Sequence, residues 1–440
     1  MGSIDPYVHW SKVVNSTRSA VEKMSISEIN KFSNELSVIS RRLRIGISQH
    51  SQYPRRERAH DSSAECELLE GDNLEWLLRL LMDKEQFDFC YIDPPYNTGQ
   101  QFVYPDLFSA TEEDGLWGRH LGWMEFMLPR LVASHGLLMD TGIMAISIDD
   151  YEYANLKLLM DAIFGEDNYI ATLVIMRSKN GKGSKPHVAV NHEYVCLYAK
   201  SSSAKVLGLH ETDDAGYDKA DEHGHFKLDG LFRKKGDASL RSDRPNMYFP
   251  LYYSSDGKVY ASPERPDLLV AWPKDSDGVE RRWLWGLEKT RADSWMLHAS
   301  RSGVIYVKNY NSAGKRVKLR SVLDRPEYLT DRATTEIKAI YGEKVFETPK
   351  PIALIRDLID CCCPAEGSIL DFFAGTGTTA EAAHELNLRD GARRRTILIE
   401  QDIPIPKSHI AKSHGYERVS DITRRRLIHL GERSKAFLFS

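Results

Sequence analysis

Two hydrophobic patterns alternate along most of the chain, and their order predicts an α/β fold. The run Phe87–Ile92 is apolar at nearly every position, which is typical of a strand that is buried on both faces. Before it, residues 74–82 repeat leucine at helical spacing. Further strands are predicted at 143–148, 170–176, 193–198, 368–373 and 396–399, with amphipathic helices between several of them. This alternation favours a mainly parallel sheet with helices on both faces.

The same patterns divide the chain into five predicted parts. Residues 1–60 repeat apolar positions at three and four and then become basic, which predicts an N-terminal helical segment. Residues 61–200 and 333–432 share the α/β pattern and are predicted to be two halves of one domain. Between them, 201–332 loses this periodicity and alternates short β-like pieces with turn residues, so we predict a largely β insert. Residues 433–440 form a tail.

Composition limits the classes of protein that fit these patterns. The 440 residues with 42% hydrophobic content are enough for two or three domains. A net charge of −4 rules out a globally basic coat, so affinity for nucleic acid would depend on local patches. Six cysteines without C-x-x-C pairing predict a reduced, cytoplasmic protein with no metal site. No segment reaches membrane-spanning length, so no membrane partner is expected.

The strand Phe87–Ile92 ends in an unusual corner, Asp93-Pro94-Pro95-Tyr96-Asn97-Thr98-Gly99. Two prolines make the backbone rigid at the edge of the sheet where open α/β folds bind their ligands. A carboxylate and a prolyl carbonyl can accept hydrogen bonds from an exocyclic amino group, while a flat aromatic ring stacks on a planar base. The alternative is a proline-rich turn that merely leaves a core strand.

A glycine turn, Gly375-x-Gly377-x-x-Ala380, lies between a predicted strand and a predicted helix, and Glu400 ends the next strand. This spacing fits the dinucleotide fingerprint. The glycines let the backbone approach a ligand, the helix N-terminus faces it, and the acid binds two ribose hydroxyls. The turn alone does not choose between ligands. Asp371 and Phe373, just before the glycines, shift the choice when they are combined with the distant proline corner.

Together the corner and the turn resemble the amino-methylating DNA methyltransferases that use S-adenosylmethionine. The order of corner, insert and glycine turn is that of the family's β group, and further segments resemble the modification (Mod) subunits of type III restriction-modification systems. The segments that carry the resemblance are 71–74, 91–99, 192–194, 198–200, 348–351 and 371–379. The resemblance implies a Rossmann-like fold with a mainly parallel seven-stranded sheet and permuted motif order. It also implies that the insert is a target-recognition domain.

The resemblance further implies a reaction, which is direct in-line transfer of a methyl group to the N6 amino group of an adenine flipped out of double-stranded DNA. Asp93 and the Pro94 carbonyl would accept hydrogen bonds from that amino group, and Tyr96 would stack on the base. Lys350 would pair with the carboxylate of the cofactor. The implied cofactor-binding residues are Asp72, Asp93, Lys350, Pro351, Asp371, Phe373, Gly375, Gly377 and Glu400. A structural role for Asp371 beneath the turn stays open.

Contacts with DNA are predicted in two regions. Basic side chains in the loop after the strand 170–176 would follow the phosphates of the target strand, although a solvated lysine loop is the alternative. In the insert, basic and aromatic residues interleave, which suits phosphate and base contacts but fits an aromatic-cored domain with a charged exterior equally well. The predicted DNA-binding residues are Lys179, Lys182, Lys185, His187, Arg281 and Arg282.

Several alternatives stay open for partners and activity. Family habit implies a homodimer, and both a restriction subunit as partner and a stand-alone enzyme fit the sequence. Methylation of cytosine N4 is the closest rival, although those enzymes more often carry Ser at the position of Asp93. RNA or another amide-bearing substrate, a nicotinamide-dependent oxidoreductase and a catalytically silent DNA-binding subunit are further rivals. Intact Asp93, Tyr96 and glycine turn disfavour the silent subunit.

Overall fold

The computed structural model describes residues 55–58, 66–99, 108, 118–181, 187–210, 216–311 and 314–438. The chain divides into two compact units. Unit 1 combines the part up to Leu209 with the part from Lys318 onward, and unit 2 is His210–Val317. The helix predicted near the N-terminus lies outside the described residues. Arg55–Arg58, within the predicted helical segment, form a strand instead.

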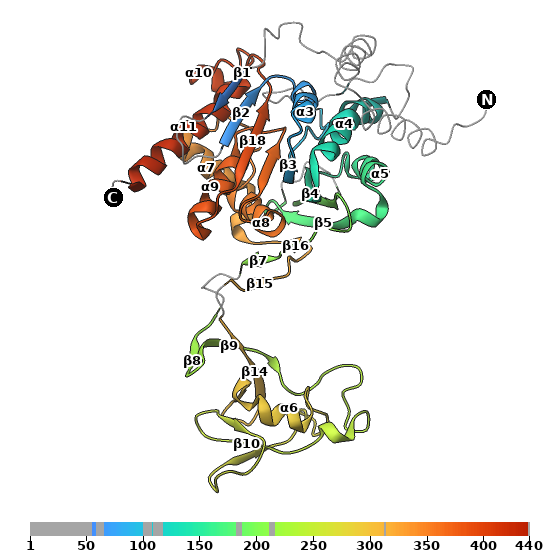
Figure 1. Cartoon of the computed structure of the whole chain (residues 1–440), viewed down its shortest axis with the longest axis vertical. Helices are drawn as coiled ribbons and strands as arrows, with labels where there is room; N and C mark the ends of the chain where they lie inside the picture. The colour runs from blue at the N-terminus through green and yellow to red at the C-terminus, as the bar shows by residue number, and fades with distance from the viewer. Residues whose placement is uncertain are drawn as a thin grey trace, which may run out of the picture. The chain divides into compact units, whose positions relative to one another are not determined.

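A nine-stranded sheet forms the centre of unit 1 (Figure 1), in the order β1-β2-β18-β17-β3-β4-β6-β5-β16. Neighbours from β2 to β4 are parallel, whereas β6 is antiparallel to both β4 and β5. The predicted mainly parallel, seven-stranded sheet is confirmed as β2 to β5 of this order, and the short β1 and β16 extend its edges. The strands are β1 (Arg55–Arg58), β2 (Cys66–Glu70), β3 (Phe87–Ile92), β4 (Leu138–Ile148), β5 (Tyr169–Met176), β6 (His192–Ala199), β16 (Val322–Leu323), β17 (Ser368–Asp371) and β18 (Arg395–Glu400).

Helices cover both faces of this sheet (Figure 1). Helices α3, α4 and α5 pack on one face, and α8 and α9 pack on the other. No helix in the described part of the chain is both long and apolar enough to cross a membrane. The helices of unit 1 are α3 (Asn73–Met82), α4 (Gly118–Leu137), α5 (Tyr153–Phe164), η2 (Glu166–Asn168), η5 (Pro326–Tyr328), α7 (Thr330–Tyr341), α8 (Ile352–Cys362), α9 (Thr378–Asp390), α10 (Ile410–Ser413) and α11 (Val419–Leu438).

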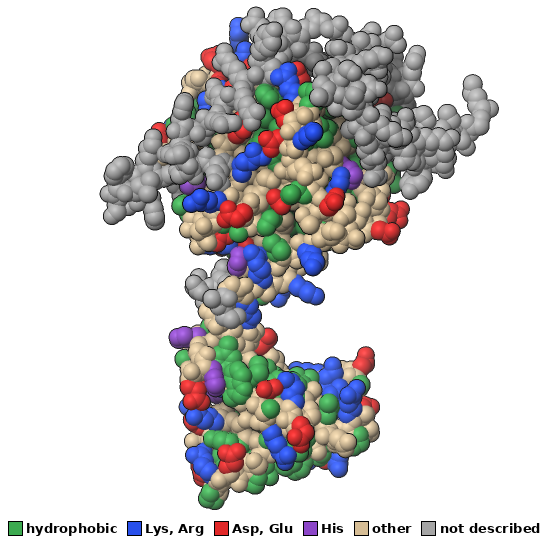
Figure 2. Space-filling model, in the orientation of Figure 1, with side chains coloured by type: hydrophobic (Ala, Val, Ile, Leu, Met, Phe, Trp, Pro, Cys, Tyr) green, Lys and Arg blue, Asp and Glu red, His purple; other side chains and the backbone are tan. Residues whose placement is uncertain are grey.

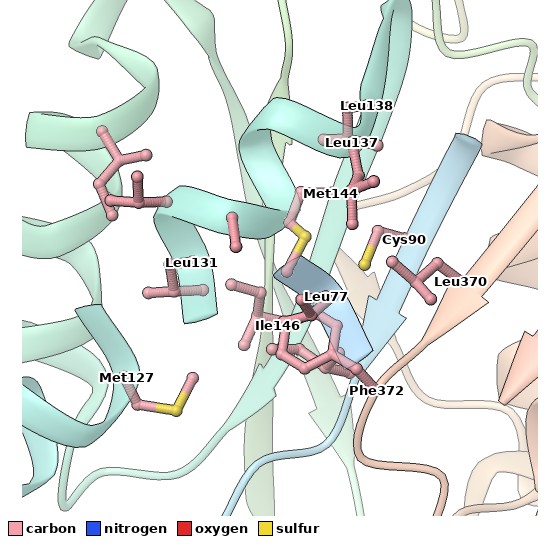
Figure 3. Packing of buried hydrophobic residues seen from close by; sticks show 14 of the residues in the cluster. Leu77, Cys90, Met127, Leu131, Leu137, Leu138, Met144, Ile146, Leu370 and Phe372 are labelled. Atoms are coloured by element: carbon pink, nitrogen blue, oxygen red, sulfur yellow. The ribbon is translucent and has the colours of Figure 1, made fainter. Parts of the chain in front are cut away.

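The apolar sequence of β3 follows from its place in the sheet, because consecutive side chains enter different cores. Cys90 and Ile92 belong to the cluster with α3, α4 and α5, whereas Phe89 and Tyr91 belong to the cluster with α8 and α9. Figure 3 shows Cys90 in the first cluster, between Met144 of β4 and Leu370 of β17. Burial on both faces holds β3 rigidly, so the corner that follows it starts from a fixed point.

Unit 2 is largely β and has an aromatic core. Phe232, Phe249, Tyr253 and Trp283 are buried together, and the Trp283 indole donates to the Phe249 carbonyl at 2.8 Å. Basic, acidic and hydrophobic side chains are interspersed on the face of this unit seen in Figure 2. Its two sheets have the orders β11-β10-β12 and β13-β14-β9-β8. Its elements are β8 (Lys219–Asp221), β9 (Gly224–Leu231), η3 (Pro245–Met247), β10 (Leu251–Tyr253), β11 (Val259–Tyr260), β12 (Leu269–Ala271), α6 (Leu287–Ala292), η4 (Ser294–Met296), β13 (Leu297–Ala299) and β14 (Ile305–Tyr310).

A further pair of strands, β7 (Leu209–His210) and β15 (Arg316–Val317), forms a two-stranded sheet. Unit 2 lies within the range 201–332 predicted for the insert. The ends of that range belong to unit 1, because β16 adds to the large sheet beside β5 and η5 precedes α7.

Candidate active site

Four acids that the sequence singled out end strands at one edge of the sheet. β17 is paired in parallel with β3, with Leu370 opposite Cys90, so Asp371 and Asp93 leave neighbouring strands at the same edge. β18 and β2 follow on the other side of β17, and they end beside Glu400 and Asp72. The proline corner and the glycine turn, almost three hundred positions apart in sequence, are therefore neighbours in space.

Buried polar contacts hold the proline corner in place. The Trp123 indole donates to the Pro95 carbonyl at 2.7 Å. Asn97 is fully buried with a φ of 58°, a left-handed conformation that asparagine tolerates better than most residues. Its amide nitrogen donates to the Arg119 carbonyl at 3.1 Å and to the buried Glu152 carboxylate at 2.6 Å. The side chain of Asn97 thus compensates for an unfavourable backbone conformation just after Tyr96.

Asn97→Ala is expected to lower the free energy of unfolding by about 3 kcal/mol, because it loses buried hydrogen bonds and leaves a β-carbon residue at positive φ. Asn97→Gly loses the same hydrogen bonds without the backbone strain, so its loss should be smaller by about 1 kcal/mol. Urea denaturation followed by tryptophan fluorescence measures both variants. Equal losses in the two would contradict the assigned strain.

A short chain of charged and polar groups surrounds Asp93. The Tyr96 hydroxyl donates to Asp93 Oδ1 at 2.6 Å. Lys350 Nζ donates to both Asp93 oxygens at 2.8 Å and lies 2.8 Å from the Tyr96 hydroxyl. Burial, followed by the nearby carboxylates, raises the pKa of Tyr96 well above its usual value, so its hydroxyl stays protonated. Lys350 is largely buried, and it directly precedes Pro351, the N-cap of helix α8.

Two residues that sequence reasoning gave no role complete this chain of groups. Glu193 on β6 is buried, and its Oε2 lies 3.6 Å from Lys350 Nζ and 3.5 Å from the Tyr96 hydroxyl. Arg177, just after β5, approaches the same oxygen of Glu193 with Nε at 3.5 Å. Glu193 lies in the segment 192–194 that carried the family resemblance, so a signal was available. Arg177 had no such signal.

The glycine turn is stabilised from beneath by Asp371. Its Oδ2 accepts from the Thr379 hydroxyl at 2.5 Å, and its Oδ1 accepts from the Phe373 amide at 3.0 Å. Burial raises the pKa of Asp371 to about 7. Gly375 and Gly377 have φ values of 54° and 79°, which glycine adopts without strain. These contacts support the structural role that the sequence left open for Asp371.

Glu400 lies against the same turn and is suited to bind a diol. Its Oε2 accepts from the Gly375 amide at 2.5 Å, and its Oε1 accepts from the Gln401 amide at 2.8 Å. Burial raises the pKa of Glu400 to about 8, despite these hydrogen bonds. The φ of Gly375 disfavours a side chain there, and a β-carbon would also lie 3.4 Å from the Phe346 ring. A carboxylate beside a partly exposed glycine fits the ribose of a nucleoside cofactor.

Two further predicted cofactor-binding residues, Phe373 and Asp72, lie at the same edge of the sheet. The Phe373 ring lies 6.1 Å from the Phe126 ring, and Phe108 lies 5.0 Å from Phe126. Asp72 Oδ1 accepts from two amides of α3, where it is the N-cap, and its Oδ2 lies 3.2 Å from Arg130. These contacts fix the position of Asp72, whose side chain stays 32% exposed.

The predicted DNA-binding residues have different environments. Lys179 and His187 are exposed in the loop between β5 and β6, whereas Lys182 and Lys185 lie outside the described residues. In unit 2, Arg281 binds Asp275 at 2.8 Å and donates to the Ser239 hydroxyl. Arg282 donates to the Ala238 carbonyl at 2.7 Å and to the Trp283 carbonyl. Both arginines thus have partners within unit 2, which gives them a role in holding its loops together.

Comparisons with known proteins agree with this geometry. The model of the N6_N4_Mtase family, described as "DNA methylase", matches residues 87–412. The chain is 48% identical over 415 residues to the type II methyltransferase M.KpnI of Klebsiella pneumoniae, covering 94% of this chain and 97% of that protein. It is 35% identical over 394 residues to the EcoPI Mod subunit of a type III restriction-modification enzyme from Escherichia phage P1.

Coverage differs between these relatives. The EcoPI alignment spans 82% of this chain but 61% of the Mod subunit, so the chain corresponds to part of that longer protein. Among solved structures, the M1.HpyAVI–SAM complex is 13% identical, with a TM-score of 0.36, and the match covers 82% of this chain and 99% of that one. The family match includes both the proline corner and the glycine turn, and it confirms the predicted methyltransferase. The chain belongs to the N6_N4_Mtase family of DNA methylases.

Proposed function

We propose that this protein methylates the N6 amino group of adenine in double-stranded DNA. One observation carries the proposal: the Asp93–Tyr96 corner and the Gly375 turn leave the paired strands β3 and β17 at one edge of the sheet. An acceptor site for an amino group and a binding turn for a nucleoside cofactor are therefore adjacent. Asp93, where N4-cytosine enzymes more often carry Ser, favours adenine.

The chemistry of the acceptor explains why a carboxylate is needed. An exocyclic amine is a poor nucleophile because its lone pair is delocalised into the aromatic ring. Asp93 and the Pro94 carbonyl accept hydrogen bonds from its two N–H groups. These bonds hold the two hydrogens out of the plane in which the nitrogen conjugates with the ring, so the lone pair becomes localised on nitrogen. Tyr96 stacks on the base, which compensates part of the few kcal/mol that flipping it out of the duplex costs.

The methyl donor is S-adenosylmethionine. When bound, it supplies an electrophilic methyl group on a positively charged sulfur. The protein itself binds the cofactor and orients it. Glu400 takes the ribose hydroxyls, the turn at Gly375 and Gly377 lets the backbone approach, and Phe373 packs against the cofactor. No covalent enzyme intermediate is required, because positioning two bound reactants supplies most of the rate enhancement.

The remaining parts of the proposal concern DNA and partners. Unit 2, on whose surface basic, acidic and hydrophobic side chains are interspersed, reads the target sequence, and the exposed Lys179 and His187 lie along the target strand. We propose that the protein is a cytoplasmic homodimer, because the family resemblance implies a dimer. The full-length match to a type II methyltransferase supports a stand-alone enzyme, whereas the match to Mod subunits supports a restriction subunit as partner.

Digestion of methylated DNA to nucleosides tests the proposal. Purified protein is incubated with S-adenosylmethionine and genomic DNA from a strain without adenine or cytosine methylation, and the nucleosides are separated by mass spectrometry. N6-methyladenine is expected. N4-methylcytosine would contradict the choice of base, and a lack of any methylated base would contradict the activity. Sequencing of the same DNA locates the modified position.

A further inference from the structure

Lys350 binds the two carboxylate oxygens of Asp93, which a target amino group would also use. Its ammonium group donates to both oxygens of Asp93, at 2.8 Å each. The family resemblance implied that this lysine would pair with the carboxylate of the cofactor, and in the structure it binds Asp93, the carboxylate proposed to accept the base. Lys350 and the Tyr96 hydroxyl together use three of the roughly four lone-pair positions of this carboxylate, so a target amino group would compete with Lys350 for the Asp93 oxygens.

A second carboxylate is available to the same ammonium group. Glu193 Oε2 lies 3.6 Å from Lys350 Nζ, so a small rotation of the lysine side chain would turn this contact into a hydrogen bond. Glu193 is only 3% exposed, and Arg177 Nε lies 3.5 Å from the same oxygen, so the carboxylate is held in place. The Tyr96 hydroxyl, which contacts Lys350, Asp93 and Glu193, lies between the two positions.

We propose that Lys350 and Glu193 are positioning residues that act as a two-position switch on the acceptor site. Lys350 holds the Asp93 oxygens while no base is bound, and it moves onto Glu193 when the amino group of the target base takes those oxygens. This inference rests on the proposed function, since it requires an amino-bearing base at Asp93.

The electrostatics of the reaction favour such a movement. The amino nitrogen becomes positively charged as it bonds to the methyl carbon, and an ammonium group on Asp93 would oppose that charge. Complete loss of the lysine is also unfavourable, because Asp93 and Glu193 would then face each other as like charges in a half-buried site. A lysine that moves a short distance satisfies both requirements.

Several other titratable groups lie near Asp93 and contribute to the electrostatic potential at its carboxylate. Tyr91 on β3 and Tyr96 stay protonated, because burial raises the pKa of both well above the usual value. Among the described residues, Asp371 on β17 and Asp149 at the end of β4 are further acids near the site, and Arg177 is a second cation. Lys350 therefore supplies a large part of the positive charge among these groups.

Methylation kinetics distinguish this switch from a simple cofactor contact. In Lys350→Met, Asp93 and Glu193 lose the cation that they share, so kcat/KM for DNA should fall about tenfold, while the Kd for S-adenosylmethionine stays within threefold. In Glu193→Gln, Lys350 has no second position, so kcat falls about tenfold with cofactor affinity unchanged. The double variant should be no more impaired than Lys350→Met, because the two residues act through one contact.

Controls separate the switch from general destabilisation. Lys157→Met removes another lysine that binds both oxygens of one carboxylate, that of Asp161 at 2.6 and 2.7 Å, outside the site. It should leave kcat and KM at wild-type values. Glu193→Asp keeps the charge and should recover most of the kcat lost in Glu193→Gln.

Two outcomes would overturn the inference. A tenfold or larger increase in the Kd for S-adenosylmethionine in Lys350→Met, with an unchanged kcat/KM for DNA at saturating S-adenosylmethionine, would assign Lys350 to the cofactor. Wild-type kcat in Glu193→Gln would remove Glu193 from the reaction. Genomic DNA and tritiated S-adenosylmethionine serve for all variants. If the wild-type protein transferred no methyl group, the proposed function itself would fail, which is a distinct result.

Discussion

Asp93→Asn is expected to lower methyl transfer about a thousandfold, while the Kd for S-adenosylmethionine stays within about threefold of wild type. Asparagine keeps the shape of the side chain but replaces one acceptor oxygen with an NH2 donor. That donor would face the N–H groups of the target base, so the amino lone pair is no longer localised. The same change removes one of the two hydrogen bonds from Lys350.

Asp357→Asn is a matched control for this variant. Asp357 on α8 also accepts from a tyrosine hydroxyl, that of Tyr328 at 2.5 Å, and it binds the cation of Arg325 at 3.1 Å. Its contacts belong to the cluster on the face of the sheet covered by α8 and α9, where Tyr328 is buried. The control should lower the thermal midpoint and retain wild-type kcat. More than a tenth of wild-type activity in Asp93→Asn would contradict the role of Asp93.

Glu400→Gln is expected to raise the Kd for S-adenosylmethionine about a hundredfold, because it weakens charge-assisted hydrogen bonds to the ribose hydroxyls. With a pKa of about 8, Glu400 is mostly protonated at pH 7 in the free protein. Ribose hydroxyls that donate to the carboxylate favour its charged form, so cofactor binding should release close to one proton. Calorimetry at pH 7 in two buffers with different ionisation enthalpies measures this release.

The Glu400→Gln variant should remove that buffer dependence, whereas Glu385→Gln, which changes a carboxylate that binds Arg356, should preserve it. The raised pKa values of Glu400 and Asp371 also affect stability without cofactor. Their folded-state values, about 8 and about 7, lie above those of an unfolded chain, so the free energy of unfolding falls as pH rises from about 4.5 to 8. A release of no proton, or wild-type buffer dependence in Glu400→Gln, would contradict the binding role of this residue.

Periodicity predicted the sheet because its central strands are buried on both faces. Phe87–Ile92 is apolar almost throughout, and its alternate residues enter two different cores. The short edge strands were missed for the opposite reason. β16 has two residues, one of them exposed, and β1 is strongly basic, so neither has an apolar pattern that indicates a strand.

The candidate site was predictable where function depends on backbone geometry and hidden where it depends on long side chains. Prolines after Asp93 and glycines at 375 and 377 leave a clear pattern in the sequence. The partner of Asp93 is separated from it by 257 positions, and a lysine has too many rotamers for its contact to follow from spacing. Arg281 and Arg282 illustrate the same limit, since basic residues in a loop do not indicate whether they bind DNA or their own domain.

The position of unit 2 in the chain, between two strands of the large sheet, allows such enzymes to diversify. The chain leaves unit 1 after β6 and re-enters it at β16, and both strands are direct neighbours of β5. Residues 210–317 can therefore be exchanged, lengthened or shortened by recombination without altering the register of β3 against β17. On the proposed role of unit 2 in reading DNA, a lineage can acquire a new target sequence in a single genetic event while it inherits its reaction chemistry unchanged.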